Sequence, residues 1–166
     1  MKKILMIAIV LAMSTMAMAQ SVGEVIDKYK SLDNAESMTL TKDMLSMMTA
    51  MAQNSKDLDA EARESMEMMK NIEQMTTLQV KEADAATATT LMSDMRKALS
   101  KGYEITTDMQ EDNESVVIAI KKKKKKDNHA SEVVIVAKEE KETVVVYIIG
   151  KIDMDKIGNL MNMTKD

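Results

Sequence analysis

The residues that could perform acid–base or thiolate chemistry are few in this chain. The 166 residues include one histidine, His129, and no cysteine. Thiolate nucleophiles, thiolate metal sites and disulfides are therefore excluded. A Ser-His-Asp triad would depend on His129, but the charged turn Asp127-Asn128-His129 is a poor place to hold a general base in position.

Carboxylates are abundant, yet they form no recognisable catalytic motif. The pairs Asp57/Asp59 and Asp153/Asp155 are of a kind that arises by chance among 27 acidic residues, and Asp153 is better interpreted as the cap of a terminal helix. The glycine-rich nucleotide motifs, GxSxG and HExxH are all absent. We therefore expect no enzymatic activity, no metal and no cofactor.

Methionine is the remaining residue type with chemical potential, at 20 residues in a chain without Phe or Trp. Met44, Met47, Met48 and Met51 have the i, i+3, i+4, i+7 spacing of one helix face. Clustered thioethers can bind copper, and flexible methionines can also form a binding surface. Because the only histidine lies in a charged turn, the stripe predicts a buried helix face that fills the core in place of aromatic residues.

A run of six lysines is the most unusual stretch, and its members are candidate interaction residues: Lys121, Lys122, Lys123, Lys124, Lys125 and Lys126. One interpretation is a basic finger that makes weak contacts with an anionic surface. The alternative is a solvated hairpin tip that keeps a sheet edge in solution. Acidic residues flank the run on both sides, and the net charge of −4 argues against nucleic-acid binding.

The elements that position these residues are strands in the C-terminal third. The predicted strands are Tyr103–Gln110, Ser115–Lys123, Glu132–Lys138 and Thr143–Gly150, followed by a helix at Asp153–Met163. Short polar turns between them predict an antiparallel meander.

These strands are apolar at consecutive positions, whereas a sheet with one wet face alternates. The second face therefore needs a cover, and the candidates are a helix of the same chain, a second copy in a homodimer, or an apolar ligand. Val117, Val145 and Tyr147 are candidate interaction residues on this basis.

The N-terminal part predicts helices and short strands. The expected helices are Val22–Leu32, a helix from Lys42 to near Gln53 capped by Thr41, Ala60–Gln74, and Ala85–Ser100 with Gly102 as its stop. The last of these has an apolar stripe that we expect to face inward, made of Leu91, Met92, Met95 and Leu99. The expected strands are Ser37–Thr41 and Thr77–Glu82. Together these elements predict an α+β fold, a largely antiparallel sheet with helices packed on one face.

The first nineteen residues have the pattern of a secretion signal. Lys2 and Lys3 precede an apolar stretch, and Ala17-Met18-Ala19 is a small-x-small cleavage site. The apolar stretch is short for a membrane span, and no cysteine follows for lipid attachment. We expect cleavage of residues 1–19 and a single periplasmic or extracellular domain, residues 20–166, that is neither membrane-spanning nor a lipoprotein.

Two blocks, Ser37–Leu45 and Tyr147–Ile157, resemble the domain-of-unknown-function 4252 family, small exported proteins mainly of Bacteroidetes. Asp27-Lys28-Tyr29 and Gly102-Tyr103-Glu104 add to the resemblance. The resemblance implies export and an α+β architecture, and it assigns no functional residue. The sequence thus favours a non-catalytic protein that binds an envelope partner or contributes to envelope homeostasis, with a carrier of an apolar or anionic ligand as the alternative.

Overall fold

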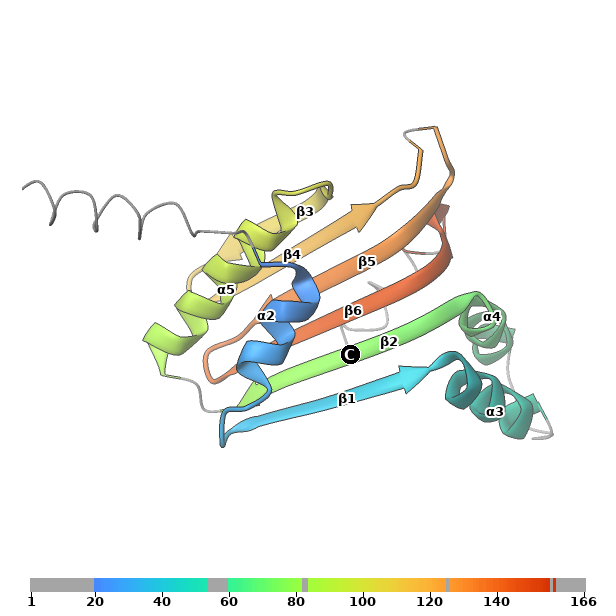
Figure 1. Ribbon diagram of the computed structural model, residues 1–166, viewed down its shortest axis with the longest axis horizontal. Helices are drawn as coiled ribbons and strands as arrows, with labels where there is room; N and C mark the ends of the chain where they lie inside the picture. Colours follow the sequence, from blue (N-terminus) through green and yellow to red (C-terminus); the bar gives the residue numbers. More distant parts are fainter. Residues whose placement is uncertain (1–19, 54–59, 82–83, 125, 156, 158–166) are drawn as a thin grey trace, which may run out of the picture.

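The computed structural model describes residues 20–53, 60–81, 84–124, 126–155 and 157, in which four helices and one six-stranded sheet form an α+β fold (Figure 1). The expected signal segment and most of the expected terminal helix lie outside these residues. The helices are α2 (Val22–Tyr29), α3 (Lys42–Gln53), α4 (Ala60–Met69) and α5 (Ala85–Leu99). The strands are β1 (Ala35–Thr41), β2 (Ile72–Lys81), β3 (Glu104–Glu111), β4 (Glu114–Lys121), β5 (His129–Lys138) and β6 (Glu142–Asp153).

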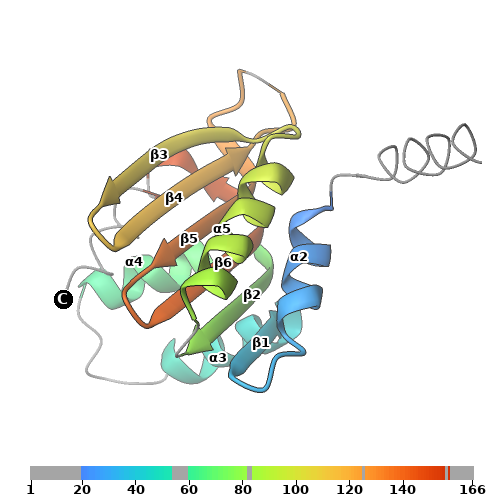
Figure 2. The same cartoon turned by 90° about the vertical axis from the view of Figure 1, so that its left-hand side faces the viewer.

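The sheet is antiparallel throughout, with the strand order β1-β2-β6-β5-β4-β3. The predicted four-stranded meander β3–β6 is confirmed, and the N-terminal hairpin β1–β2 joins it by pairing β2 with β6. β6 is therefore a central strand, although it comes last in the chain. Figure 2 shows how the sheet twists beneath the two helices on its covered face.

Helices α2 and α5 cover one face of the sheet. Ser21 and Glu24 form a capping box at the start of α2, which satisfies amide groups that have no partner within the helix. Asp84 caps α5 through the Thr87 amide, at 2.6 Å. The predicted inward stripe of α5 is confirmed. The larger buried side chains of these two helices are Val22, Val25, Ile26, Tyr29, Leu91, Met92, Met95 and Leu99.

The two covering helices are also joined by polar contacts. The Lys28 ammonium lies 2.7 Å from a carboxylate oxygen of Asp94, and the Tyr29 hydroxyl donates to the same oxygen at 3.1 Å. The hydrogen bond from Lys28 is the main reason why the pKa of Asp94 lies below its ordinary value, and it outweighs the opposing effect of burial. These contacts join α2 to α5 on the same face of the sheet.

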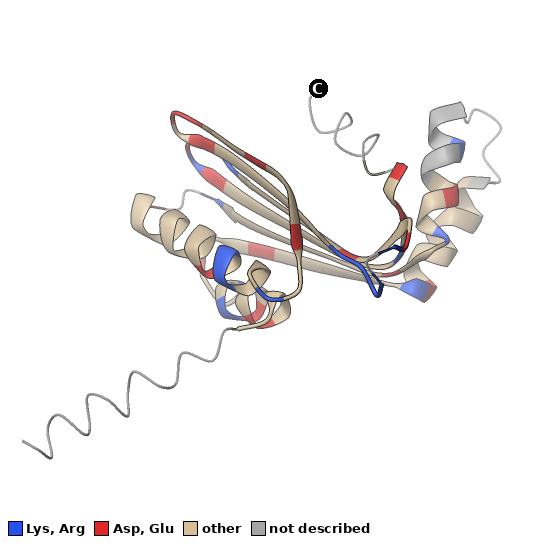
Figure 3. Cartoon of the chain, turned by 90° about the horizontal axis from the view of Figure 1, so that it is seen from above, with Lys and Arg blue, Asp and Glu red and all other residues tan. Residues whose placement is uncertain are grey.

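Helices α3 and α4 stand at the other end of the sheet, on the side of the opposite face (Figure 3). The predicted burial of the α3 methionines is wrong. Met44, Met47, Met48 and Met51 are 44–67% exposed, whereas Leu45 beside them is 2% exposed. The reason is positional, because α3 packs on the rim of the sheet and not on its broad face, so only a narrow strip of the helix is covered.

Several element boundaries also differ from the predictions. The helix expected to reach Gln74 ends at Met69, because Ile72–Gln74 pair with Ile149 and Gly150 of β6. α2 ends at Tyr29 and not at Leu32. The predicted caps agree better, since the Thr41 hydroxyl accepts a hydrogen bond from the Met44 amide at 3.5 Å. Gly102 has φ +80° after α5, as a helix stop requires.

The opposite face of the sheet has its own apolar cluster, as the non-alternating strands predict. Its buried members are Ile120, Ala130, Val133, Ile148, Ile152 and Ile157, with Ile72, Met75, Ile135, Val146 and Met154 packed against them. Ile135 and Val146 remain partly exposed towards the middle of this face. The helices α3 and α4 reach only its end, and a pocket lies there.

Candidate functional site

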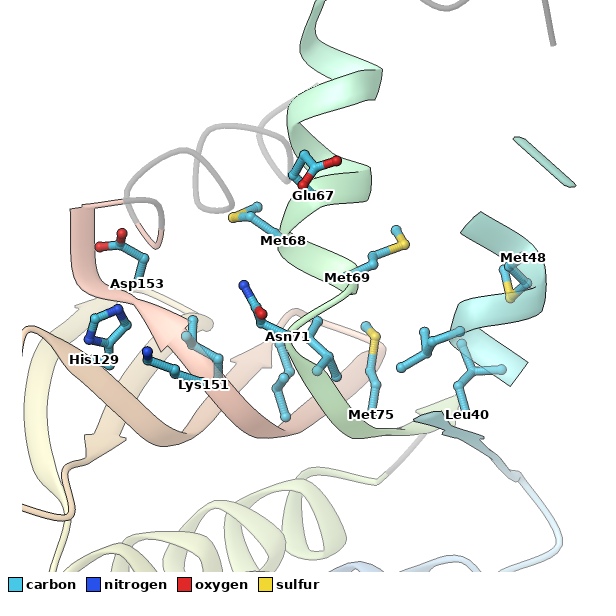
Figure 4. Close-up of a pocket in the computed structure, with 14 residues that line it drawn as sticks. Leu40, Met48, Glu67, Met68, Met69, Asn71, Met75, His129, Lys151 and Asp153 are labelled. Atoms are coloured by element: carbon cyan, nitrogen blue, oxygen red, sulfur yellow. The ribbon is translucent and has the colours of Figure 1, made fainter. Parts of the chain in front are cut away.

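A pocket of about 300 Å³ lies between α3, α4 and the end of the sheet (Figure 4). Its walls are mainly thioether and aliphatic side chains. The apolar lining residues are Leu40, Leu45, Met48, Met68, Met69, Ile72, Met75, Ile148 and Ile152. The polar lining residues are Glu67, Asn71, His129, Lys151 and Asp153.

The strand pleat decides which side chains enter the pocket. Successive residues of a strand point to opposite faces, so Leu78 packs under α2 and α5 while Met75 points into the pocket. Ile148 of β6 pairs with Met75 and lies on the same face. Met48 of α3 and Met68 of α4 close the pocket from the helical side. Four methionines from three elements therefore surround one cavity.

The turn from α4 into β2 depends on a glycine in the neighbouring strand. The Asn71 carbonyl accepts a hydrogen bond from the Lys151 amide at 2.9 Å. A Cβ atom at Gly150 would overlap that carbonyl and would lie 2.8 Å from the Ile72 Cα atom. Only a residue without a side chain allows this close approach. Gly150 therefore holds the base of the pocket together.

The polar end of the pocket is formed by the end of β6 and the start of β5. His129 pairs with Asp153 across the two strands. The Asp153 carboxylate accepts a hydrogen bond from the Asp155 amide at 3.1 Å, which agrees with its predicted capping role. Glu67 forms an ion pair with Lys70. Among the described residues, no ion-pair partner is found for the ammonium group of Lys151.

The exposed methionines of α3 adjoin this pocket. We call Met44, Met47, Met48 and Met51 the methionine face, and Met48 belongs to both the face and the pocket lining. Large apolar side chains that are exposed together on one helix are unusual for a surface without a partner. Methionine is flexible and polarizable, so such a surface can adapt to differently shaped apolar groups.

Metal binding has no support from oxygen and nitrogen ligands in the described part of the chain. Within it, no group of three or more His, Cys, Asp and Glu side chains is placed to hold a metal ion. The pocket brings His129 to the same cavity as four thioethers, a proximity that the sequence alone does not show.

A separate polar cluster surrounds Glu132 on β5. The hydroxyl groups of Tyr103 and Tyr147 both donate to its Oε2 atom, the latter at 2.7 Å, and Lys121 donates to Oε1 at 2.9 Å. Burial opposes the charge of Glu132, but the three hydrogen bonds together hold its pKa below the ordinary value. Burial and the hydrogen bond to Glu132 raise the pKa of Tyr147 to about 12. All three donors are therefore engaged within the protein.

The lysine run divides into a paired residue and a solvated loop. β4 ends at Lys121 and not at Lys123, and Lys121 pairs with Glu132. Lys123, Lys124 and Lys126 are exposed, Lys122 is partly exposed, and Lys125 lies outside the described residues. Figure 3 shows the basic loop between β4 and β5.

The other sequence-predicted candidates lie in different surroundings. Val117 and Val145 are 0% exposed and belong to the core beneath α2 and α5, so in this fold they cannot contact a partner. Tyr147 is half-buried and bonded to Glu132. The structure thus brings Tyr147 and Lys121 together on one carboxylate, whereas Val117 and Val145 lie in the core.

The pocket residues were not predicted as a site. In the sequence, Met48 belongs to a helix stripe, and His129 lies in a charged turn that disfavours it as a general base. Met75 and Lys151 carry no local signal, because they come together through the pairing of β2 with β6, whose paired residues lie more than 60 positions apart in sequence. Met68 reaches the same cavity from α4.

The chain matches the family model described as a domain of unknown function, DUF4252, over residues 29–160. The chain belongs to the DUF4252 family. The matched range runs from the end of α2 past the end of β6, so it contains every residue of the pocket. Membership confirms the resemblance noted in the sequence, and it names no activity.

Neither the curated proteins nor the solved structures contain a significant match to this DUF4252 chain. In the described residues, none of the helices has the length and apolarity needed to cross a membrane.

Proposed function

We propose that this DUF4252 protein is a non-catalytic, exported binding protein of the cell envelope, and that it binds its partner through the methionine face. The observation that carries the proposal is the exposure of Met44, Met47 and Met51 by 44%, 57% and 67% on one short helix. Hydrophobic groups displayed together on a rim are typical of interaction surfaces.

The position of the face supports a protein partner. α3 lies at one end of the sheet and is not covered by α2 or α5 (Figure 1). A partner helix or loop with apolar side chains would lie along the face and could insert one side chain beside Met48 into the pocket. Thioethers tolerate several shapes of insert, which suits a contact made with an apolar segment.

The proposed export and envelope location rest on the sequence. Residues 1–19 have the charge, apolar stretch and small-residue site of a secretion signal. Expression of the full chain, followed by fractionation and intact-mass measurement, tests this part. We expect a mature form that begins at Gln20 in the exported fraction, and an uncleaved cytoplasmic product would contradict it.

Site-specific photo-cross-linking tests the partner. A photoreactive residue in place of Met47 is expected to give a discrete protein adduct in whole cells, and the adduct should be lost when Met44 and Met51 are changed to Gln. The same photoreactive residue in place of Asn113, an exposed turn residue between β3 and β4, is the control. Monomer alone at both positions, or equal adducts at both, would remove the support for the methionine face.

A second candidate function is a carrier of a small apolar ligand, and the pocket favours it. Its volume of about 300 Å³ lies at the lower limit of ligand pockets, which are roughly 300–1,000 Å³. Native mass spectrometry of freshly purified protein should show a bound species that is absent from a Met68→Trp variant. Protein that is consistently free of ligand would count against the carrier.

A further inference from the structure

We infer that the pocket binds a single-chain amphiphile with a carboxylate head, with its chain among the methionines and its head at Lys151. The inference rests on the carrier function proposed above and adds the chemistry of the ligand. Three features carry it, namely the shape of the apolar end, the charges at the polar end and the position of the lysine loop.

The apolar end suits one flexible chain. Met48 and Met75 line it together with Leu45, which is 2% exposed, and Ile148. Figure 4 shows the methionine side chains from α3, α4 and β2 around one space. A volume of about 300 Å³ is too small for a two-chain lipid and fits a single chain of medium length. Unbranched thioether side chains can follow a chain in more than one conformation.

The polar end favours an anion because of how its charges are already used. Glu67 is paired with Lys70. The Asp153 carboxylate accepts a hydrogen bond from the Asp155 amide, and because that donor is neutral, Asp153 keeps its negative charge beside Lys151. His129 lies opposite Asp153 in the neighbouring strand. The ammonium of Lys151 is the cation at the rim for which the described residues provide no ion-pair partner. A bound carboxylate would provide it.

The basic loop adds positive charge near the polar end of the pocket. The loop that contains Lys122, Lys123, Lys124 and Lys126 leads directly into His129, which lines the pocket. Backbone contacts hold this end of the loop to the end of β6, since the Met154 amide donates to the Asn128 carbonyl at 3.2 Å. Exposed charges act over about 8 Å at physiological salt. The loop therefore adds positive potential at the end of the sheet where the carboxylate would lie.

Calorimetric titration of the mature protein with decanoate, decanol and decylammonium separates the chain from the head. All three are used below the concentration at which they aggregate. We expect decanoate to bind about threefold to fivefold more tightly than decanol, a modest factor because Lys151 is exposed. Decylammonium should bind more weakly than decanol. Octanoate should bind about fifteenfold more weakly than decanoate, because it has two fewer methylenes and each buried methylene contributes about fourfold.

Two lysine variants assign the preference to a residue. At high salt, where the charges of the loop are screened, Lys151→Met should make decanoate and decanol bind equally. Lys141→Met, in the turn before β6, should leave the preference unchanged. Serine at positions 122–124 and 126 should reduce the preference at low salt and have little effect at high salt. Met68→Trp should abolish binding of all chains. Met48→Trp serves the same purpose if the first variant does not fold, as judged by circular dichroism.

The outcomes separate the inference from the carrier function. If no amphiphile binds, both fail. If decanoate and decanol bind equally to the wild-type protein, the head-group inference fails and the carrier function stands. Binding of decylammonium that is tighter than that of decanoate would show that Asp153 selects the head group, and it would overturn the inference. A decanoate preference that survives Lys151→Met at high salt would also overturn it. Binding to vesicles with anionic phospholipid, without binding of decanoate, would also overturn it by placing the contact on a membrane surface.

Discussion

Gly150 of β6 lies against the backbone of Asn71, just before β2 begins. The Lys151 amide donates to the Asn71 carbonyl at 2.9 Å, and the Cα atom of Ile72 lies 2.8 Å from where a Cβ of residue 150 would be. This contact joins the last strand of the chain to the hairpin formed by the first two strands. It also places Asn71, Ile72 and Lys151 in the wall of the pocket.

Gly150→Ala should destabilise the fold because a methyl group would displace backbone atoms and not a flexible side chain. We expect a loss of about 1–3 kcal/mol in the free energy of unfolding, measured by urea denaturation. Gly23→Ala in α2 is the control, since nothing lies within 4 Å of its Cβ position, and alanine there should be neutral or stabilise by up to about 1 kcal/mol. Equal effects at the two positions would contradict the close approach of Asn71.

The methionines of α3 and α5 should respond differently to substitution. Met95 is 0% exposed, so Met95→Ala should lower the free energy of unfolding by about 2–5 kcal/mol. Met47 is 57% exposed, so Met47→Gln should change it by less than about 0.5 kcal/mol. Thermal and urea unfolding of both variants checks this. A large loss of stability from Met47→Gln would mean that this side of α3 is buried in solution.

The two parts of the lysine run, Lys121 and the loop after it, should contribute differently to stability. Replacing residues 122–126 by a Gly/Ser/Asn turn of equal length should leave the free energy of unfolding almost unchanged, because the described side chains in it are exposed or partly exposed. Lys121→Met should cost about 1 kcal/mol, because its partner Glu132 is half-buried. Urea denaturation of each variant alone, and of the two combined, measures the difference. A collapse of expression after the loop replacement alone would show that the loop is part of the fold.

The cluster around Glu132 predicts how stability changes at alkaline pH. The pKa of Tyr147 is raised from its ordinary value of 10 to about 12, so folding favours the neutral phenol. This contribution is complete below pH 10 and is lost as the pH rises through 12. Ultraviolet titration of the phenolate should therefore show a late midpoint in the folded protein.

Glu132→Gln provides the matched test of that titration. Burial, the larger cause of the shift, would remain, but the contribution from the carboxylate would be lost. The Tyr147 midpoint should therefore move down towards 10 and still stay above it. The change should also cost about 1–3 kcal/mol of stability at neutral pH, because charged hydrogen bonds are replaced by weaker ones. An unchanged midpoint would mean that Tyr147 does not contact Glu132 in solution.

Local patterns were sufficient for most elements. The stripe of α5, the αL stop at Gly102 and the antiparallel meander follow from spacing and turn residues, and all of them are confirmed. The end of α4 could not be predicted in this way. Ile72–Gln74 continue a helical sequence pattern, but pairing with β6 gives them backbone hydrogen bonds that no local pattern reveals.

The sequence by itself carried the resemblance to the family, in the blocks Ser37–Leu45 and Tyr147–Ile157. It also determined the α+β class and the need to cover both faces of the sheet, because these depend on the period of apolar residues. It could not determine which methionines are buried. Met95 and Met47 lie in similar helical stripes, yet one faces the sheet and the other faces solvent. Only tertiary structure decided this, because burial depends on where a helix is placed. The pocket likewise exists because β2, β6, α3 and α4 meet at one end of the sheet.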